Sequence, residues 1–388
     1  MKKKFEVGKV LTISFAHLSH DIFTAFLAPI LPLLIDKLGI SLSMAGLLDV
    51  IRKIPSLLNP FVGLMADRIC VRYFIILTPA ITAITMSLLG NISNYPTLLI
   101  LLFVAGISST LFHVPTPVMI KHVSANQTGK GMSYYMLGGE IARTLGPLLI
   151  TAAISWWGLE GSWRVMPLGI IASFILYLKL RNISISQDFQ KKKKEIGASE
   201  TFKKLIPFFV IIFGITIFRA AMKLSLTLYL PTFLTKQGNS LWLAGISLAI
   251  LQFSGAIGTF FAGPISDKFG RKNILLITSV INPVLMWIFI SSNSTFMIPL
   301  LFIMGFFLFA SGPVLLALVQ DTNSEHPAFI NGIYMTISFG VSSLMVLLIG
   351  FLGDKFGLII TYRFCAIISI ASIPFILMLK NKNRGISK

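Results

Sequence analysis

The chain has 388 residues and a net charge of +19; 55% of its residues are hydrophobic and only 12% are charged, which gives a mean hydropathy of +0.84. Because soluble domains carry about a quarter charged residues, this composition excludes a water-soluble enzyme, a disordered chain and, with only two cysteines, a secreted disulfide scaffold. A membrane-spanning helix needs about 20 apolar residues, so the chain is long enough for about a dozen spans joined by short loops.

Twelve apolar stretches follow one another along the chain, each bounded by glycine, proline or charged residues. The first follows three lysines, as in a signal peptide, but it continues past Asp21 to about Ile35 without a small-residue cleavage site, so we expect an uncleaved helix. No strand-like alternation recurs, which favours an all-α membrane protein over an outer-membrane barrel. The predicted spans cover residues 10–35, 41–66, 73–91, 96–120, 130–156, 164–180, 205–234, 241–265, 273–292, 296–320, 327–352 and 358–379.

The positive charge follows the pattern of a membrane protein with both termini in the cytoplasm. In that orientation 23 lysines and arginines lie at cytoplasmic ends and loops, and 5 lie at outer ones. Most of the charge therefore orients the chain in the bilayer, and we expect no nucleic-acid partner. The run Lys191–Lys194 fits a solvated cytoplasmic linker. The cations that remain lie inside spans: Arg52, Lys53, Arg143, Arg219 and Lys223.

The two halves of the chain repeat each other. The segment Gly63–Arg68 ends the second predicted span and Gly263–Lys268 ends the eighth, at an offset of 200 residues. Two parallel six-helix halves are the architecture of a rocking transporter with its substrate site near the midplane. We therefore predict two pseudo-symmetric bundles over residues 1–181 and 205–388, joined by a basic cytoplasmic linker over 182–204.

The repeated segment resembles the signature between helices 2 and 3 of the major facilitator superfamily. The second copy is complete, with Gly263, Asp267, Lys268, Gly270, Arg271 and Lys272. The first copy keeps Gly63, Asp67, Arg68 and Arg72 but has Cys70 and Val71 at two positions. The resemblance implies a cytoplasmic latch, formed by these residues, that breaks when this side opens. In it, the glycines would allow close helix approach and the aspartates would pair with basic residues. The alternative is that the charges only set the topology.

A narrower resemblance covers most of the chain. His17 and Asp21, the segment Gly106–His113, Gly138-Gly139 and Leu145-Gly146-Pro147 are similar to segments of the fosmidomycin-resistance family in its helices 1, 4 and 5. That resemblance implies proton-driven export, in which substrate leaves by antiport with protons. The sequence differs from the drug-exporting namesake by charges at Asp49, Arg52, Lys53, Glu140 and Arg143, which argues against the same antibiotic substrate.

Charged residues inside the spans are candidates for function, because each costs at least ~2.5–3.5 kcal/mol at the bilayer centre. His17, His20 and Asp21 are spaced i, i+3, i+4 and share one helix face. A carboxylate beside imidazoles can hold and pass a proton, so we predict Asp21, with His17 and His20, as the proton-coupling group. The alternative is that Asp21 pairs structurally with Arg143 or Arg219.

The other intramembrane charges predict an anion site. Glu140 is a second candidate proton carrier and can pair with Arg143, three residues away, which we assign to substrate binding. Arg219 and Lys223, four residues apart on one face, have no acid in their own helix and fit the same role. Asp49 can pair with only one of Arg52 and Lys53 at a time, leaving the other for the cavity. His113 is either part of the site or a packing histidine.

These intramembrane charges sum to +2, which an anionic substrate would compensate. The sequence has no H-E-x-x-H, G-x-S-x-G or P-loop motif, so we expect neither an enzyme nor an ATP-driven pump, and a channel would not need the repeated latch. We therefore predict a monomeric, proton-coupled transporter that exports a small organic anion across a bacterial inner membrane by alternating access. It would need no cofactor beyond the proton gradient. The five histidines include no metal-like pair flanked by carboxylate ligands, so we expect no metal site. The alternatives are uptake of a carboxylate-rich compound, such as a citrate-type siderophore or an organic acid, and a ligand sensor on a transporter fold.

Overall fold

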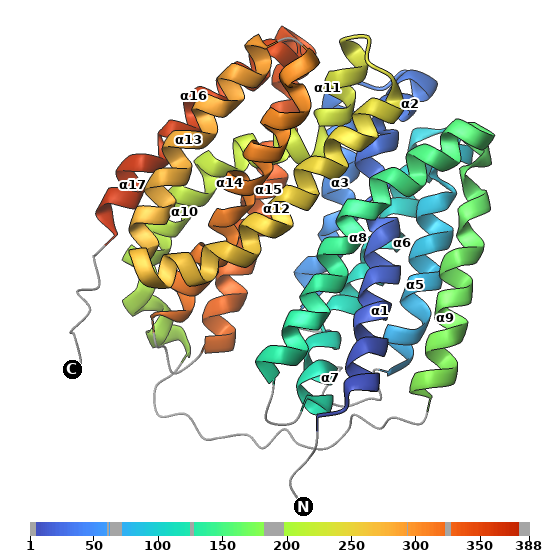
Figure 1. The fold of residues 1–388 in the computed structure, drawn as a ribbon, viewed down its shortest axis with the longest axis horizontal. Helices are drawn as coiled ribbons and strands as arrows, with labels where there is room; N and C mark the ends of the chain where they lie inside the picture. The colour runs from blue at the N-terminus through green and yellow to red at the C-terminus, as the bar shows by residue number, and fades with distance from the viewer. Residues whose placement is uncertain are drawn as a thin grey trace, which may run out of the picture. The chain divides into compact units, whose positions relative to one another are not determined.

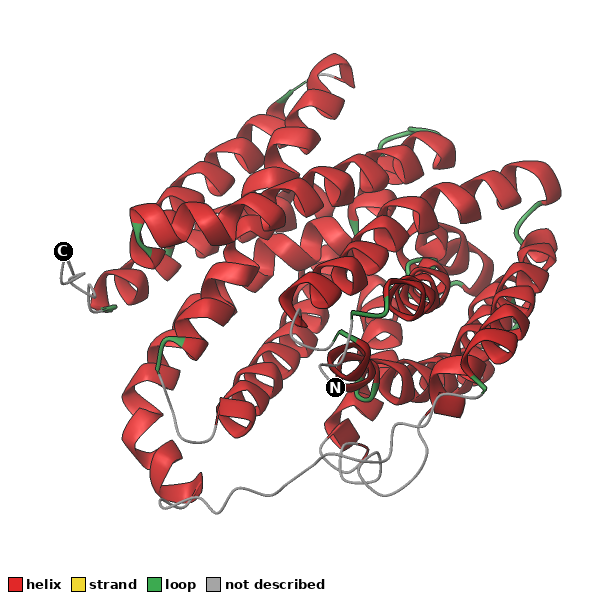
Figure 2. Ribbon diagram, turned by 60° about the horizontal axis from the view of Figure 1, so that its bottom comes forward, coloured by secondary structure: helices red, strands yellow, loops and turns green. Residues whose placement is uncertain are grey.

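A computed structural model gives the structure of the protein. It describes residues 5–59, 62, 72–124, 128–181, 198–292, 294–322 and 327–379. Within these ranges every regular element is helical and no strand is present (Figure 2). The all-α prediction is confirmed.

The amino-terminal half begins with α1 (Val7–Thr24) and α2 (Leu27–Leu38), which together form the first predicted span. The helix is interrupted at Ala25 and Phe26, four and three residues before Pro29. Proline lacks an N–H and its ring clashes with the carbonyl four residues earlier, which accounts for the break. The later elements of this half are α3 (Leu42–Lys53), η1 (Ile54–Leu58), α5 (Arg72–Ser87), η2 (Leu89–Asn91), α6 (Tyr95–His113), α7 (Thr116–Val123), α8 (Thr128–Trp157), η3 (Glu160–Val165) and α9 (Met166–Leu180).

The carboxy-terminal half uses longer helices with short connections. Gly270 and Gly357 each link two consecutive helices with a positive φ, of 90° and 78° respectively, a conformation that glycine adopts without strain. The elements are α10 (Ala198–Leu228), α11 (Leu230–Lys236), α12 (Leu241–Phe269), α13 (Arg271–Ser291), α14 (Ser294–Gln320), α15 (Pro327–Phe356), α16 (Leu358–Ile370) and α17 (Ser372–Met378).

Eleven helical segments in the described residues are long and apolar enough to cross a membrane. They match eleven of the twelve predicted spans. The remaining one, over 41–66, corresponds to α3 and η1, and its end lies outside the described residues. Large apolar side chains such as Ile100, Phe174 and Phe260 are exposed, as expected where lipid is the solvent. The chain is a multi-pass membrane protein.

The helices form two compact units. The first comprises Met1–Lys191 together with Leu228–Gln252, and the second comprises Lys192–Thr227 together with Phe253–Lys388. The inclusion of 228–252 in the first unit reflects local packing: α11 lies against α2, and the Tyr229 hydroxyl donates to the Leu42 carbonyl at 3.0 Å. The predicted linker falls mainly on residues 182–197, outside the described ranges, so its boundaries stay a prediction.

Within the first unit, α1 packs along α8 and also contacts α5 and α9 (Figure 1). Glycines on α8 permit this approach: a Cβ at Gly138 would lie 2.5 Å from the Ser14 carbonyl oxygen, and one at Gly146 would lie 2.5 Å from that of Ile22. These two contacts hold the middle of α8 level with the part of α1 that carries His17 and Asp21.

Within the second unit, α13 packs against α14 and α16, and α15 packs against α16. Its buried core includes Ile212, Leu275, Val314 and Ile376. The contact of α12 with α14 is close, because a Cβ at Gly258 would lie only 2.1 Å from the Phe306 carbonyl oxygen.

Candidate functional site

The centre of the first unit holds one carboxylate surrounded by three imidazoles. Asp21 Oδ2 lies 3.1 Å from His17 Nε2, and Asp21 Oδ1 lies 2.9 Å from His20 Nδ1 and 3.1 Å from His113 Nε2. The Asp21 side chain is only 12% exposed. The predicted group of His17, His20 and Asp21 is therefore brought together by α1. The end of α6 adds His113, expected either in the anion site or as a packing histidine, and its Nε2 instead contacts the proposed proton-coupling carboxylate.

The hydrogen bonds of His17 determine where its protons lie. Its Nδ1 is 2.7 Å from the Tyr135 carbonyl oxygen, which can only accept, so Nδ1 carries a proton. Its Nε2 faces the carboxylate oxygen of Asp21. If Nε2 also donates, His17 is an imidazolium paired with Asp21. The proton on Nδ1 is therefore held by the Tyr135 carbonyl. The proton that can move is the one between Nε2 and the Asp21 carboxylate.

The other two histidines differ in their exposure. His20 is fully buried, its ring stacks on Phe112 with centroids 4.5 Å apart, and its Nε2 has no hydrogen-bond partner among the described residues. Its role is to donate from Nδ1 and orient the carboxylate. His113 is 38% exposed, and its Nδ1 lies 3.4 Å from the Tyr135 hydroxyl. His113 is therefore the most accessible imidazole of the three.

Gly139 makes room for His17. A Cβ at this position would lie 2.5 Å from His17 Cε1. The Gly138-Gly139 pair noted in the sequence thus has a steric reason, since the α8 backbone passes directly beside the imidazole. Tyr135, one turn earlier on α8, contacts His17 and His113 and was not predicted. Nothing in its local sequence separates it from other aromatic residues of that span.

Asp49 forms a second charged group with Arg52 and Lys53. Its Oδ1 accepts from Arg52 Nη2 at 2.8 Å, and its Oδ2 accepts from Lys53 Nζ at 2.6 Å. The expectation that Asp49 pairs with one cation at a time is wrong, because the two oxygens of a carboxylate can each accept from neighbours at i+3 and i+4. The expectation that one cation is left for the cavity is therefore also not met.

A single threonine connects these two charged groups. The Thr24 hydroxyl donates to the Asp21 carbonyl at 2.8 Å, and the Thr24 carbonyl accepts from Arg52 Nη1 at 2.9 Å. Movement of α3 against α1 would therefore act on the backbone of Asp21. Because Thr24 is an uncharged residue at a helix end, no pattern in the sequence distinguishes it.

Glu140 and Arg143 form the predicted ion pair on α8. Arg143 is 42% exposed and Glu140 is 14% exposed. The alternative in which Arg143 pairs with Asp21 is not observed within the described ranges, where the guanidinium binds Glu140 and Asp21 binds the three histidines.

Arg219 and Lys223 lie in the second unit on α10. Arg219 Nη1 donates to Ser279 Oγ at 2.5 Å and lies 3.4 Å from the Leu275 carbonyl oxygen, both on α13. No carboxylate among the described residues pairs with Arg219. Lys223 is exposed, with its Nζ 5.3 Å from the centre of the Phe309 ring. Among the described residues, Arg219 thus contacts neutral acceptors, and its part in anion binding stays a prediction.

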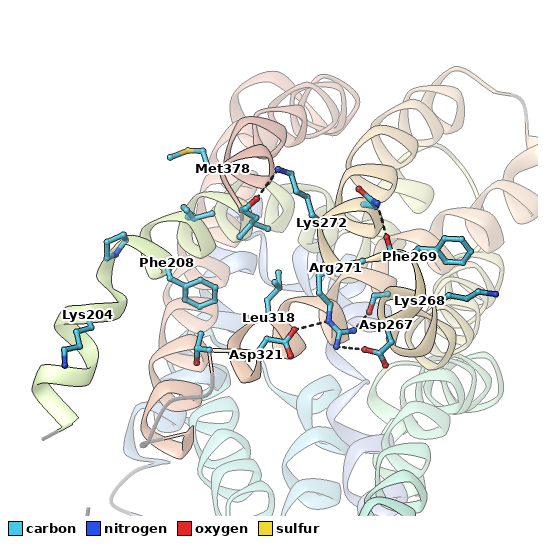
Figure 3. A pocket seen from close by; sticks show the side chains of 17 residues that line it. Lys204, Phe208, Asp267, Lys268, Phe269, Arg271, Lys272, Leu318, Asp321 and Met378 are labelled. Carbon is cyan, nitrogen blue, oxygen red and sulfur yellow. Dashed lines mark hydrogen bonds and ion pairs between the residues drawn. The ribbon is translucent and has the colours of Figure 1, made fainter. Parts of the chain in front are cut away.

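The second copy of the predicted latch centres on Arg271, at the start of α13. Its Nη2 lies 2.6 Å from Asp267 Oδ1, and its Nε lies 3.5 Å from Oδ2 of Asp321, the residue that follows α14. Figure 3 shows the guanidinium between these two carboxylates. Lys268 instead lies over the Phe269 ring at 5.6 Å and forms no ion pair within the described part of the chain.

Gly263 does not play the predicted steric role. A Cβ there would meet no described atom within 4 Å, so close helix approach is not what this glycine provides. Its carbonyl oxygen instead accepts from Ser266 Oγ at 2.8 Å and lies 3.4 Å from Arg271 Nη1. The position contributes a backbone acceptor to the latch.

The first copy of the latch lies mostly outside the described residues, including Gly63, Asp67 and Arg68. Arg72 begins α5, with its guanidinium carbon 5.1 Å from the Tyr73 ring centre. Beside the second copy the structure has a cavity of about 1120 Å³, with Lys204, Phe208, Leu318 and Lys272 in its wall (Figure 3). None of the residues that line it is a predicted substrate residue.

Comparison with known proteins places this geometry in a family. The model of the Major Facilitator Superfamily matches residues 13–344. The fosmidomycin resistance protein of Escherichia coli (strain K12) is 23% identical over 99% of this chain and 95% of its own length. The citrate-proton symporter of Klebsiella pneumoniae is 26% identical over 47% of this chain and 41% of its own length.

A solved structure shares the fold. The crystal structure of a bacterial homolog to the human lysosomal transporter Spinster, inward-facing and unoccupied, covers 97% of this chain and 96% of its own, with a TM-score of 0.78 at 17% identity. The chain belongs to the major facilitator superfamily and is a membrane transporter, not an enzyme.

Proposed function

We propose that this transporter couples the movement of a small organic anion to protons by alternating access, and that it exports the anion across a bacterial inner membrane. Both termini would lie in the cytoplasm, as the distribution of lysine and arginine suggests. The proton gradient would be its only energy source, with no cofactor, and the monomer would be the working unit. The observation that carries this proposal is the Asp21 carboxylate in contact with three imidazoles.

The proton step is supported by the position of His17. With Nδ1 committed to the Tyr135 carbonyl, loss of the second proton would leave the Nε2 lone pair facing the Asp21 carboxylate at 3.1 Å. This arrangement would be repulsive, so the protonated and deprotonated states would favour different positions of the His17 ring, whose Nδ1 contacts the α8 backbone at Tyr135. Such a difference is what a proton needs in order to bias a conformational equilibrium.

The anionic substrate is supported by the excess of cations. Arg52 and Lys53 share one carboxylate, and Arg219 contacts only neutral acceptors among the described residues. Arg143, although paired with Glu140, presents two-fifths of its side chain to the surroundings. A guanidinium is the side chain best suited to bind carboxylate or phosphonate oxygens in pairs.

Export is favoured by the likeness to the fosmidomycin resistance protein over almost the whole chain. The second candidate function is proton-driven uptake of a carboxylate-rich compound, and the likeness of 192 residues to a citrate-proton symporter favours it. The two candidates use the same groups and differ in the sign of the proton movement that accompanies the substrate.

Purified protein in liposomes loaded with a pH-sensitive dye tests both. The vesicles are challenged with phosphonates, mono- and polycarboxylates and cationic drugs. We expect proton movement with an anion, absent in Asp21→Asn and retained in Asp36→Asn, whose carboxylate is exposed on α2. The sign separates antiport from symport. Proton movement with cations alone would overturn the anion proposal, and anion transport without proton movement would overturn the coupling.

A further inference from the structure

We propose that His17, Asp21 and His113 form a binding site for a divalent transition-metal ion of the Zn²⁺ class. One nitrogen of each imidazole and one carboxylate oxygen of Asp21 lie within 4.8 Å of one another. The inference goes beyond the proposed function, because metal binding can be measured on the purified chain whether or not anion transport is found.

The donor atoms select the class of ion. Two imidazoles and one carboxylate are a ligand set used for Zn²⁺ and for first-row transition metals, whereas Mg²⁺ and Ca²⁺ prefer oxygen alone. The spacing also fits: His17 Nε2 lies 3.1 Å from Asp21 Oδ2 and His113 Nε2 lies 3.1 Å from Asp21 Oδ1, so the two oxygens of one carboxylate face the two imidazoles. A tetrahedral ion with bonds of about 2.0–2.1 Å separates its ligand atoms by about 3.4 Å, so a small outward adjustment admits the ion.

The surroundings hold each ligand as metal sites usually require. The Nδ1–H of His17 donates to the Tyr135 carbonyl, which leaves Nε2 as the coordinating nitrogen. The Tyr135 hydroxyl lies 3.4 Å from Nδ1 of His113, and His20 Nδ1 donates to Asp21 Oδ1 at 2.9 Å. Metal-bound histidines commonly donate their other N–H to a carbonyl or carboxylate, which fixes the ring and its tautomer. Here a single tyrosine supports both imidazoles.

Charge and access favour an ion at this point. Without a metal, His17 can donate to both the carbonyl and the carboxylate only when both of its nitrogens carry a proton. A divalent ion between His17 Nε2 and Asp21 Oδ2 would instead be bound by the lone pair of the neutral imidazole and by the carboxylate. His17 and Asp21 are almost fully enclosed, but His113 is 38% exposed. The exposed side of His113 gives the ion a way in and leaves space for a water molecule as a further ligand.

The test uses full-length, untagged protein in detergent, titrated with Zn²⁺ by calorimetry and with Co²⁺ by visible absorption. We expect one ion per chain and a cobalt spectrum of low-symmetry, four- or five-coordinate type. His17→Gln, Asp21→Asn and His113→Gln should each weaken Zn²⁺ binding by more than about tenfold. The control is the double variant His122→Gln/His326→Gln, which removes the two histidines of the chain other than His17, His20 and His113. It should leave the stoichiometry and the affinity for Zn²⁺ unchanged.

The variant His113→Cys tests the proposal even if the substitutions that remove a ligand side chain disturb the fold. It should retain Co²⁺ binding and add a sulfur-to-metal charge-transfer band, because a thiolate then enters the coordination sphere. Unchanged Zn²⁺ affinity in correctly folded His113→Gln, or loss of binding in the His122/His326 control alone, would overturn the proposal. None of these measurements depends on transport. A failure of the metal-site proposal can therefore be distinguished from a failure of the anion-transport proposal.

Discussion

At the scale of single residues, the site depends on how many partners one carboxylate can satisfy. Asp21 contacts three imidazoles, and Asp49 accepts from two cations. In a low-dielectric interior a carboxylate is tolerated only when such partners surround it. The partners differ in kind: imidazoles can gain and lose a proton near neutral pH, whereas Arg52 and Lys53 stay charged. The Asp21 group is thus suited to proton transfer and the Asp49 group to holding structure.

Asp21→Asn tests the proton assignment. The amide keeps the shape of the side chain but cannot hold the negative charge that pairs with an imidazolium. We expect substrate exchange across the liposome membrane to persist while uphill accumulation driven by a pH gradient is lost. Accumulation at the wild-type level in Asp21→Asn would exclude this carboxylate as the coupling group, and Asp36→Asn serves as the matched control.

Asp49→Asn should destabilise the protein rather than uncouple it. The change leaves Arg52 and Lys53 adjacent and without their shared carboxylate. Leaving partly buried charged donors unsatisfied costs about 1–3 kcal/mol, so we expect a lower thermal midpoint in detergent. The double variant Asp49→Asn/Lys53→Met should recover part of the loss, since it removes one of the two cations. No change in midpoint for the single variant would contradict this structural role.

Arg219→Gln tests whether this guanidinium binds the anionic substrate. Arg219 donates to Ser279 and pairs with no carboxylate in the described part of the chain, so its loss should cost little stability. We expect a weaker apparent affinity for the transported anion, by about tenfold or more for a charge-assisted contact, with normal amounts of folded protein. Lys223→Gln should act in the same direction. Loss of folded protein in Arg219→Gln would instead favour a purely structural role.

At the scale of the elements, backbone proximity decides which side chains meet. The α8 glycines let α8 lie against α1, and this contact brings the Tyr135 carbonyl and hydroxyl to two histidines. The end of α6 then supplies His113. Three helices therefore build the site, and the spacing between them is as important as the ligands.

Gly139→Ala should disturb the site through sterics alone. The new Cβ would lie 2.5 Å from the His17 ring, and overpacking of this kind costs about 1–3 kcal/mol. We expect weaker proton coupling and a lower thermal midpoint. Gly263→Ala is a matched control, because its Cβ would meet no described atom within 4 Å. Equal behaviour of the two variants in both measurements would contradict the packing argument.

The latch at the start of α13 can be tested with a substitution of Arg271 that keeps its positive charge but changes the arrangement of its hydrogen-bond donors. Arg271 uses all three guanidinium nitrogens: Nη2 contacts Asp267, Nε contacts Asp321, and Nη1 contacts both Ser266 and the Gly263 carbonyl. Lysine keeps the charge but cannot make these contacts together. Arg271→Lys should therefore change the maximal transport rate more than the apparent substrate affinity. Lys268→Gln should have the smaller effect, since Lys268 forms no ion pair within the described ranges; the reverse order would contradict this geometry.

At the scale of the whole molecule, the sequence repeat and the packing give different divisions of the chain. The repeat divides the chain near the middle, whereas packing assigns Leu228–Gln252 to the first unit. The difference arises because α11 and the start of α12 bury their side chains against α2 and α8. An example is Gly245, where a Cβ would lie 2.5 Å from Thr151 Cγ2. A hydropathy pattern records that such a helix is apolar but does not record which neighbour covers it.

The sequence by itself determined the properties that depend on composition and local spacing. These are the membrane class, the helical spans, the family signature, the shared face of His17, His20 and Asp21, and the Glu140–Arg143 pair. Hydropathy and helical periodicity act over one or two turns, so they can be read along the chain.

Only the tertiary structure decided which distant groups complete each site. His113 and Tyr135 reach Asp21 and His17 across about 90–120 positions of sequence, Ser279 reaches Arg219 across 60, and Gly263 contributes a carbonyl rather than a close approach. Such contacts depend on how helices far apart in the chain lie against one another. That arrangement is set by the packing of many small side chains at once, and no local pattern records it.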